Sequence, residues 1–246
     1  MYKAAIEHAR NAIANATLHT DPFDHIYVEN VFPEDFYATL QANLPDTQFY
    51  DRLADTPRVS PNYNRERYVI SSTLSSLNKL PGAQRDFWLE FLRAMYVQSF
   101  AHSVLTKFGP TIQTRFAKEA GHEGMDLNLQ WNALLIRDLA QYSLPPHTDS
   151  PGKLVATLFY LPGLFGAPEL GTTLYTPRDP EFECSGIGRH YKFEQFHQGH
   201  TMAYQPNTLF AFAKTSQSFH GVEPVPPQVA RDVLLFDIRR DEGEVA

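Results

Sequence analysis

The segment YSLPPHTDSPGKLVATLFYLP, residues 142–162, joins a polar, proline-containing stretch to an apolar run that is rich in strand-forming residues. His147 and Asp149 lie one residue apart, immediately before that run. On an extended strand, residues i and i+2 point to the same face with their Cα atoms about 6–7 Å apart. An imidazole and a carboxylate placed in this way can bind one metal ion at bond lengths of about 2 Å. Taken alone, an H-x-D triplet also fits a solvated turn before a strand.

The sequence on both sides of this segment has the period of β-strands. DLNLQWNALLIRD, residues 126–138, alternates apolar residues with Asn128, Gln130 and Asn132. Downstream, short apolar segments are separated by Pro and Gly: VATLFYLP, GTTLYTP, TMAYQP, TLFAFA, FHGVEPV and RDVLLFDIRR. Many short strands with no helices between them predict a β-sandwich or a small barrel, and the 18 Phe and 12 Tyr suit the packing of such a core.

The N-terminal half has mainly helical patterns. Residues 2–16 predict an amphipathic helix, residues 24–32 a strand, and Pro33 the start of a second helix carrying Phe36 and Leu40. We expect an exposed loop at 60–68, and a long helix over 84–108 that carries Phe87, Phe91 and Met95 and is ended by Gly109-Pro110. This pattern predicts one domain, residues 1–246, with mostly helical support over 1–125 and a β core over 126–240.

Composition excludes several classes of protein. The net charge of −7 and the absence of a basic stripe are not typical of a nucleic-acid-binding protein. Cys184 is the only cysteine, so a disulfide-linked secreted scaffold is excluded. The N-terminus has no apolar signal region and no stretch reaches membrane-spanning length. We therefore expect a cytoplasmic protein without a membrane partner; the oligomeric state is left open.

Two further residues of interest lie far downstream, in SQSFHGVEPVPPQVARDVLLFDI, residues 216–238. If the proline-rich connection folds as a hairpin centred near residues 225–226, His220 and Arg231 come level on neighbouring strands. Arg231 would begin an inward-facing row with Val233 and Leu235. Burying an unpaired charge is costly, so an inward arginine needs an anionic partner, and a carboxylate held by the guanidinium fork is the natural one.

The order H-x-D, distant His, then Arg resembles the iron(II)/2-oxoglutarate-dependent dioxygenases, and in particular the bacterial, prolyl-hydroxylase-like members. Here the pattern is His147-Thr148-Asp149, His220 and Arg231. FDHIYVENVFPEDFYATLQANLPD is similar to the N-terminal segment of many bacterial members, and LFYLP with GTTLY is similar to their central strands. The resemblance spans most of the chain.

The resemblance implies a double-stranded β-helix, or jelly roll, with helical N-terminal support. It implies that His147, Asp149 and His220 bind iron(II), and that Arg231 binds the far carboxylate of the co-substrate 2-oxoglutarate, with dioxygen as second co-substrate. The implied reaction is hydroxylation of an unactivated C–H bond in a small molecule or biosynthetic intermediate, with release of succinate and carbon dioxide. Desaturation or ring closure, and hydroxylation of a protein side chain, are alternatives.

One departure from the family pattern concerns the co-substrate. Relatives often carry Ser or Thr two residues after the arginine, whereas this chain has Val233. We expect another donor to compensate, with Tyr142 the first candidate and Thr157 the second, and Asn132 either lines the pocket or faces water. If Arg231 does not bind the carboxylate, Arg178 and Arg189 are the next cations to consider.

Two other classes of function compete with this interpretation. His190, His197 and His200 suggest a zinc site, but they lack the usual spacing and an H-E-x-x-H motif; we expect a loop near the substrate mouth. A cupin-like binding module usually presents an H-x-H pair, which is absent, and would not need Arg231. A hydrolase is disfavoured because there is no G-x-S-x-G motif and Cys184 has no evident partner.

Overall fold

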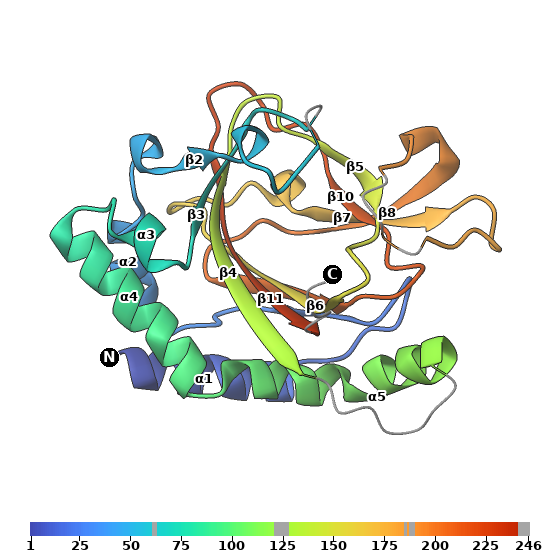
Figure 1. Ribbon diagram of the computed structural model, residues 1–246, viewed down its shortest axis with the longest axis horizontal. Helices are drawn as coiled ribbons and strands as arrows, with labels where there is room; N and C mark the ends of the chain where they lie inside the picture. Colours follow the sequence, from blue (N-terminus) through green and yellow to red (C-terminus); the bar gives the residue numbers. More distant parts are fainter. Residues whose placement is uncertain (61–62, 121–127, 185, 187–189, 241–246) are drawn as a thin grey trace.

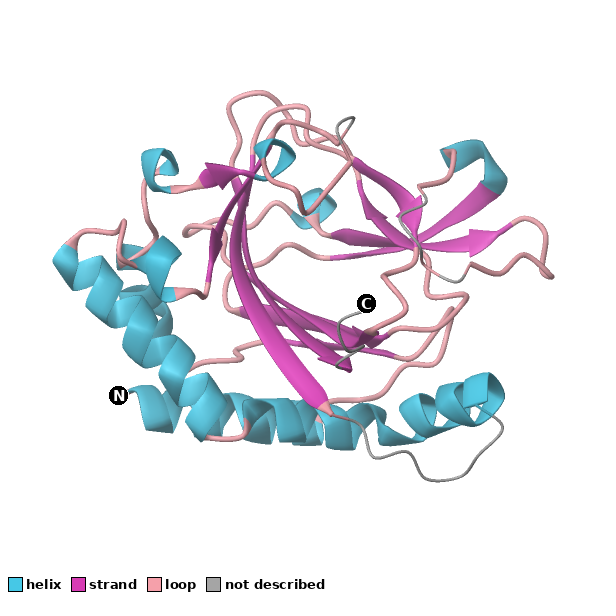
Figure 2. Ribbon diagram, in the orientation of Figure 1, coloured by secondary structure: helices cyan, strands magenta, loops and turns pink. Residues whose placement is uncertain are grey.

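Two antiparallel sheets face each other, and the helices lie along the outer face of the larger one (Figures 1 and 2). The computed structural model describes residues 1–60, 63–120, 128–184, 186 and 190–240. Among these residues, no helix combines the length and the apolar character needed to cross a membrane.

The larger sheet has seven strands in the order β1-β9-β6-β11-β4-β3-β2. Their bounds are β1 His25–Val28, β2 Asp51–Arg52, β3 Arg67–Ser71, β4 Leu129–Asp138, β6 Lys153–Tyr160, β9 Thr208–Ala213 and β11 Arg231–Arg240. The smaller sheet has four strands in the order β5-β10-β7-β8. Its members are β5 Leu144–His147, β7 Thr172–Pro177, β8 Phe196–Met202 and β10 His220–Val222.

The helices come almost entirely from the first half of the chain. They are α1 Tyr2–Asn15, α2 Glu34–Ala42, α3 Leu74–Leu77, α4 Gly82–Val97 and α5 Phe100–Ala120. Single 3-10 turns occur at η1 Thr47–Phe49, η2 Leu53–Asp55, η3 Pro168–Leu170 and η4 Phe193–Gln195.

The alternation along the strands of the larger sheet separates two apolar cores. On β4, Ala133 and Leu135 point to the core between the helices and the larger sheet, which we call the outer core. Leu134 and Ile136 point to the core between the two sheets, which we call the inner core. The outer core contains an aromatic cluster in which Phe32 packs on Phe91 and Phe159, linking a helix to the sheet. The inner core leaves room for polar side chains, and the candidate site lies there.

The prediction of a mainly β fold with N-terminal helical support is confirmed, and the architecture is a double-stranded β-helix. Residues 1–125 supply the five helices together with β1, β2 and β3, and β1 lies within the strand that was predicted over residues 24–32.

The prediction of one long helix over 84–108 was wrong at both its middle and its end. Ser99 has a φ of 55°, in the left-handed region that interrupts a helix, so α4 ends at Val97 and α5 begins at Phe100. Pro110 lies inside α5 and does not end it. Burial of Phe108, Ile112 and Phe116 in the outer core continues the apolar stripe past the proline and offsets the lost backbone hydrogen bond.

The predicted hairpin between His220 and Arg231 was also wrong. Strand β10 pairs with β5 and β7 in the smaller sheet, whereas β11 pairs with β4 and β6 in the larger one. Pro224, Pro226 and Pro227 have no N–H to donate to a ladder, so the segment crosses between the sheets. Val225, between them, exchanges backbone hydrogen bonds with Gln141 and Tyr142 in the turn before β5.

Candidate metal centre

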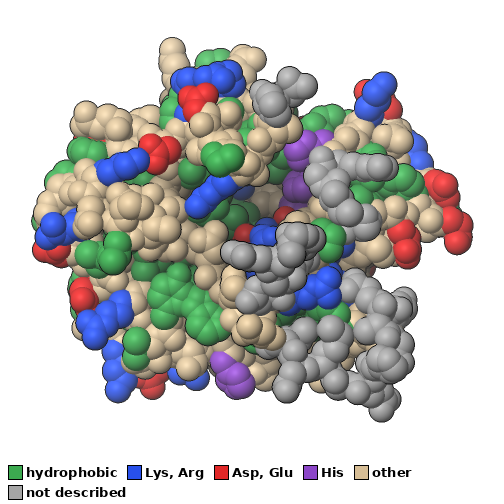
Figure 3. Space-filling model, viewed as in Figure 1, with side chains coloured by type: hydrophobic (Ala, Val, Ile, Leu, Met, Phe, Trp, Pro, Cys, Tyr) green, Lys and Arg blue, Asp and Glu red, His purple; other side chains and the backbone are tan. Residues whose placement is uncertain are grey.

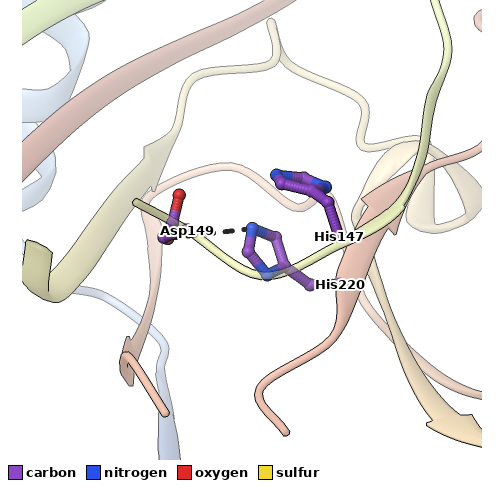
Figure 4. A group of neighbouring side chains, drawn as sticks. All are labelled: His147, Asp149 and His220. Carbon is purple, nitrogen blue, oxygen red and sulfur yellow. Dashed lines mark ion pairs between the residues drawn. The ribbon is translucent and has the colours of Figure 1, made fainter. Parts of the chain in front are cut away.

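Two histidines are brought together by strand pairing in the smaller sheet. His147 at the end of β5 stands directly opposite His220 at the start of β10, and their ring centroids are 4.4 Å apart. Asp149 follows β5 and turns toward both rings (Figure 4). One ligand atom from each of the three residues lies within 4.8 Å of the others, the only such group in the described part of the chain. The structure thus brings together the three residues that the sequence predicted as metal ligands.

Both imidazoles are oriented by backbone carbonyls. His147 Nδ1 donates to the carbonyl of Pro145 at 3.1 Å, and His220 Nδ1 donates to the carbonyl of Ser218 at 3.0 Å. This leaves the Nε2 lone pair of each ring free for a metal, the usual arrangement of histidine ligands. Burial lowers the pKa of both imidazoles, that of His147 by a large amount, which favours the neutral form that a metal requires.

The two oxygens of Asp149 have different environments. Oδ1 accepts from Lys153 Nζ at 2.9 Å, whereas Oδ2 is buried without a hydrogen-bond partner and lies 3.9 Å from His220 Nε2. Burial opposes ionisation, but the charge of Lys153 outweighs it and lowers the pKa of the carboxyl. An ionised oxygen without a partner, facing two neutral imidazoles, fits a divalent cation, so these three residues suit iron(II) in a facial arrangement.

Lys153 holds Asp149 from the larger sheet. Its ammonium also lies 3.0 Å from Asp237 Oδ1, and both of these side chains are buried. Burial alone would lower the pKa of Lys153, but the carboxylates of Asp149 and Asp237 raise it, so the lysine is charged. Neither Lys153 nor Asp237 was predicted; a lysine four residues after Asp149 and an aspartate inside the most apolar strand were the available signals.

A cavity of about 210 Å³ extends from the triad to Arg231. As predicted, Arg231 shares an inward row with Val233 and Leu235, and all three line this cavity. Arg231 is 1% exposed; its Nη1 donates to Asp138 Oδ2 at 2.9 Å and its Nε to the carbonyl of Leu170 at 2.5 Å. Its Nη2 is buried without a hydrogen-bond partner. A buried donor without an acceptor, on a residue that lines a cavity, indicates an anionic ligand.

A second arginine from β3 reaches the same place. Arg67 lines the cavity and binds Asp138 through two hydrogen bonds, Nε to Oδ1 at 2.6 Å and Nη2 to Oδ2 at 2.8 Å. Its guanidinium lies 4.1 Å from the ring centre of Tyr142. Two arginines around one aspartate leave one positive charge uncompensated at this end of the cavity. Residues 60–68 were predicted to be only an exposed loop, so Arg67 was missed.

The other predicted co-substrate residues lie outside this cavity. Tyr142 is fully buried in the turn before β5, and its hydroxyl lies 2.9 Å from that of Tyr63. Tyr63 lines the cavity, so Tyr142 supports a lining residue but does not line the cavity itself. Thr157 points to the opposite face of β6 from Ala156 and Leu158, which do line the cavity. Asn132 is half-buried on the inner face of β4, beyond the lining residues Leu134 and Ile136.

The remaining arginine and histidine candidates are mostly distant from the site. Arg178 is exposed and donates to the carbonyl of Glu194, and Arg189 lies outside the described residues. His190 lines the cavity with its ring 5.2 Å from that of His147. His197 and His200 are exposed on β8 and form no metal-binding group with His190 in the part of the chain that is described. The expectation of a loop near the mouth therefore holds for His190 alone.

A second, outer cavity of about 340 Å³ shares His147, Asp149, Lys153 and His190 with the inner one. It opens on the face shown in Figure 3, where histidine and basic side chains border a hollow near the centre. The triad therefore lies between an inner cavity that ends at Arg231 and an outer one that leads to the surface.

No protein-family model matches the chain, and no curated protein matches it. Among solved structures, the carbocyclase SnoK from nogalamycin biosynthesis, a non-heme alpha-ketoglutarate-dependent protein, has 10% identity, a TM-score of 0.55, and coverage of 96% of this chain and 86% of its own. The Trichoplax adhaerens prolyl hydroxylase, in complex with a hypoxia inducible factor peptide fragment, has 13% identity, a TM-score of 0.53 and coverage of 96% and 90%. The epimerase SnoN has 10% identity, a TM-score of 0.51 and coverage of 96% and 80%. These proteins share the fold of this chain.

Proposed function

We propose that the chain is an iron(II)- and 2-oxoglutarate-dependent oxygenase that hydroxylates an unactivated C–H bond of a small molecule or biosynthetic intermediate and releases succinate and carbon dioxide. The observation that carries this proposal is the pairing, in one cavity, of a buried metal-binding triad with a buried arginine that lacks an acceptor. The fold shared with SnoK and with the prolyl hydroxylase supports it.

The triad would supply three ligands and leave three positions open for small molecules. His147 and His220 would bind through Nε2 and Asp149 through Oδ2, while Lys153 retains Oδ1. Because Oδ1 is already hydrogen-bonded, we expect Asp149 to bind through one oxygen. Bound iron(II), with 2-oxoglutarate and dioxygen, supplies the oxidising power for the reaction.

The inner cavity would hold the co-substrate. Its uncompensated positive charge suits the 5-carboxylate of 2-oxoglutarate, with Arg231 Nη2 as a donor that has no other partner. Thr172 and Tyr63, which also line the cavity, add hydroxyl groups and replace the family hydroxyl that is missing at Val233. Arg67 reinforces the charge because it binds the same aspartate as Arg231.

The walls of the inner cavity would keep water from the reacting centre. Phe212 packs against His220 with ring centroids 4.5 Å apart, and Leu158, Val222 and Val233 line the space beside it. Exclusion of water strengthens the electrostatic contacts within the site and protects a reactive oxidant from side reactions.

A titration with a product assay tests the proposal. Adding 2-oxoglutarate to the anaerobic iron(II) protein should produce a metal-to-ligand charge-transfer band, and admission of oxygen should yield succinate. A cupin-like binding module would bind metal without forming the band or succinate, and that result would contradict the proposal. Zinc(II) protein serves as the control, because it should bind 2-oxoglutarate without turnover.

A further inference from the structure

We propose that the substrate carries an anionic group, a carboxylate or a phosphate monoester, on an apolar body, and that Arg58 and Arg239 bind this group at the mouth of the outer cavity. The inference rests on the proposed function, because it assigns the outer cavity to the primary substrate.

The outer cavity has an apolar wall. Its aliphatic lining is formed by Leu53, Val59, Val69, Leu134, Ile136 and Leu235. Leu53, Val69 and Ile136 belong to the inner core and are buried, so they form a fixed surface. A volume of about 340 Å³ is within the range of small-molecule sites. This wall suits the hydrocarbon part of a small substrate beside the metal ligands.

The charges around both cavities do not balance. The cations that line them are Arg58, Arg67, Lys153, Arg231 and Arg239. The carboxylates are Asp149 and Asp237, which line them, and Asp138, which pairs with Arg67 and Arg231. Five cations against three carboxylates leave two positive charges. A divalent metal and doubly charged 2-oxoglutarate cancel each other, so the excess remains in the loaded site, although the whole chain carries a charge of −7.

Arg58 and Arg239 are the lining cations that make no ion pair in the described part of the chain, and the carboxylate nearest to Arg239 on its strand, Asp237, is bound by Lys153. Arg239 continues the inward row of β11, and within the described residues its one hydrogen bond is to the Ser150 hydroxyl at 2.9 Å. Arg58 is exposed at the rim, and its guanidinium makes no ion pair or hydrogen bond with the residues that the structure describes. By contrast, Arg67, Arg231 and Lys153 each contact a carboxylate. Arg58 and Arg239 therefore have N–H donors that no carboxylate of the described residues accepts, and these donors suit an incoming anion.

Three probes with the same six-carbon chain test this assignment: hexanoate, hexyl phosphate and the neutral hexanamide. Their dissociation constants are measured by calorimetry on the full chain with iron(II) and saturating 2-oxoglutarate under nitrogen, so that Arg231 is already occupied. We expect at least one anion to bind about tenfold or more tightly than hexanamide, a difference of about 1.4 kcal/mol. The tighter of the two anions identifies the group as carboxylate or phosphate.

The double substitution Arg58→Gln and Arg239→Gln should remove the preference for the anion and leave hexanamide binding unchanged. Arg178→Gln, an exposed arginine outside both cavities, is the matched control and should keep the preference. The inference is overturned if hexanamide binds as tightly as both anions or if the preference survives the double substitution. It is also overturned if neither anion binds with a dissociation constant of about 1 mM or below, a binding free energy of about −4.1 kcal/mol, while 2-oxoglutarate does bind. Failure of 2-oxoglutarate itself to bind would instead overturn the proposed function.

Discussion

The two carboxylate oxygens of Asp149 have different roles, one in holding the side chain in place and one in binding a ligand. One oxygen is held by Lys153 and the other is left without a partner toward His147 and His220. A residue that only stabilised the fold would have both oxygens satisfied, because an unpartnered buried carboxylate oxygen costs free energy. The unsatisfied oxygen is therefore the strongest sign of a ligand.

The first prediction concerns the triad. His147→Ala, Asp149→Ala and His220→Ala should each abolish stoichiometric iron(II) binding with little change in the fold, because each removes one of three ligands. Bound iron is measured after anaerobic dialysis, and the fold is checked by circular dichroism. His190→Ala is the control, since its ring lies 5.2 Å from that of His147 but is outside the ligand group. Full iron content in any triad variant would remove that residue from the site.

The second prediction concerns the arginine pair. Removing either Arg231 or Arg67 leaves one arginine paired with Asp138, so this end of the inner cavity loses its net positive charge. Arg231→Ala and Arg67→Gln should each weaken 2-oxoglutarate binding by roughly 2–5 kcal/mol, or about 30-fold to several-thousand-fold. Iron binding should survive in both. Arg231→Lys should restore part of the affinity, because lysine supplies the charge without the fork.

Arg137→Gln is the matched control for Arg67→Gln. Arg137 binds Asp232 through two hydrogen bonds in the same sheet and is similarly buried, yet it lines neither cavity. The Arg137→Gln variant should have a lower free energy of unfolding and an unchanged affinity for 2-oxoglutarate. Equal weakening of 2-oxoglutarate binding in both variants would show that the effect of Arg67→Gln is structural.

The sequence predicted His147, Asp149, His220 and Arg231 because each lies in a recognisable local pattern. It did not predict Arg67, Asp138 or Lys153, because their roles depend on strands that meet only in the folded sheet. Tyr142 was predicted to donate to the co-substrate, but its hydroxyl contacts Tyr63 and Tyr142 does not line the cavity. Which side-chain atom reaches a ligand depends on strand register, which local spacing does not determine.

At the scale of elements, strand positions were predictable and strand partners were not. Most of the apolar segments after residue 126 contain strands of the structure, since a period of two marks a strand wherever one face is buried. The exception is TMAYQP, residues 201–206, which overlaps only the last two residues of β8, a strand formed mainly by residues that were expected to be a loop. The pairing of β10 with β5 could not be inferred, because the proline-rich segment between residues 222 and 231 can form a hairpin or a crossover. Tertiary contacts also decided the end of a helix. Gly109-Pro110 predicts a helix end, but burial of the apolar residues that follow keeps α5 continuous through Pro110.

The third prediction concerns α4 as scaffold. Phe91 is fully buried and packs against Phe32, Phe36 and Trp88 beneath the larger sheet. Phe91→Ala should lower the free energy of unfolding by about 3–5 kcal/mol through the cavity it leaves. Denaturant unfolding measures the loss, and 2-oxoglutarate affinity should stay unchanged under native conditions. Unchanged stability combined with altered ligand binding would place the helix in the site.

For the whole molecule, the fourth prediction links ligands to stability. A ligand that binds only the folded state stabilises it by about 2.7 kcal/mol at one hundred times its dissociation constant. Iron(II) and 2-oxoglutarate, added anaerobically, should each raise the melting temperature, and a chelator should reverse both effects because the co-substrate needs the metal. Arg231→Ala should retain the increase from iron and lose most of that from 2-oxoglutarate. An identical response in Arg231→Ala and the unsubstituted protein would contradict the assignment of the inner cavity.

The two ends of the inner cavity belong to different sheets. His147 and His220 lie on the smaller sheet, whereas Arg67, Asp138 and Arg231 lie on the larger one. A dicarboxylate bound at both ends would link the two sheets, and the packed core between the sheets sets their separation. The distance between the two sheets would then select the length of the co-substrate, and we expect the five-carbon 2-oxoglutarate to bind more tightly than oxaloacetate, which is one carbon shorter. Succinate has one carbon fewer and lacks the keto group, so it would no longer contact both sheets, and each turnover would itself weaken the binding of its product.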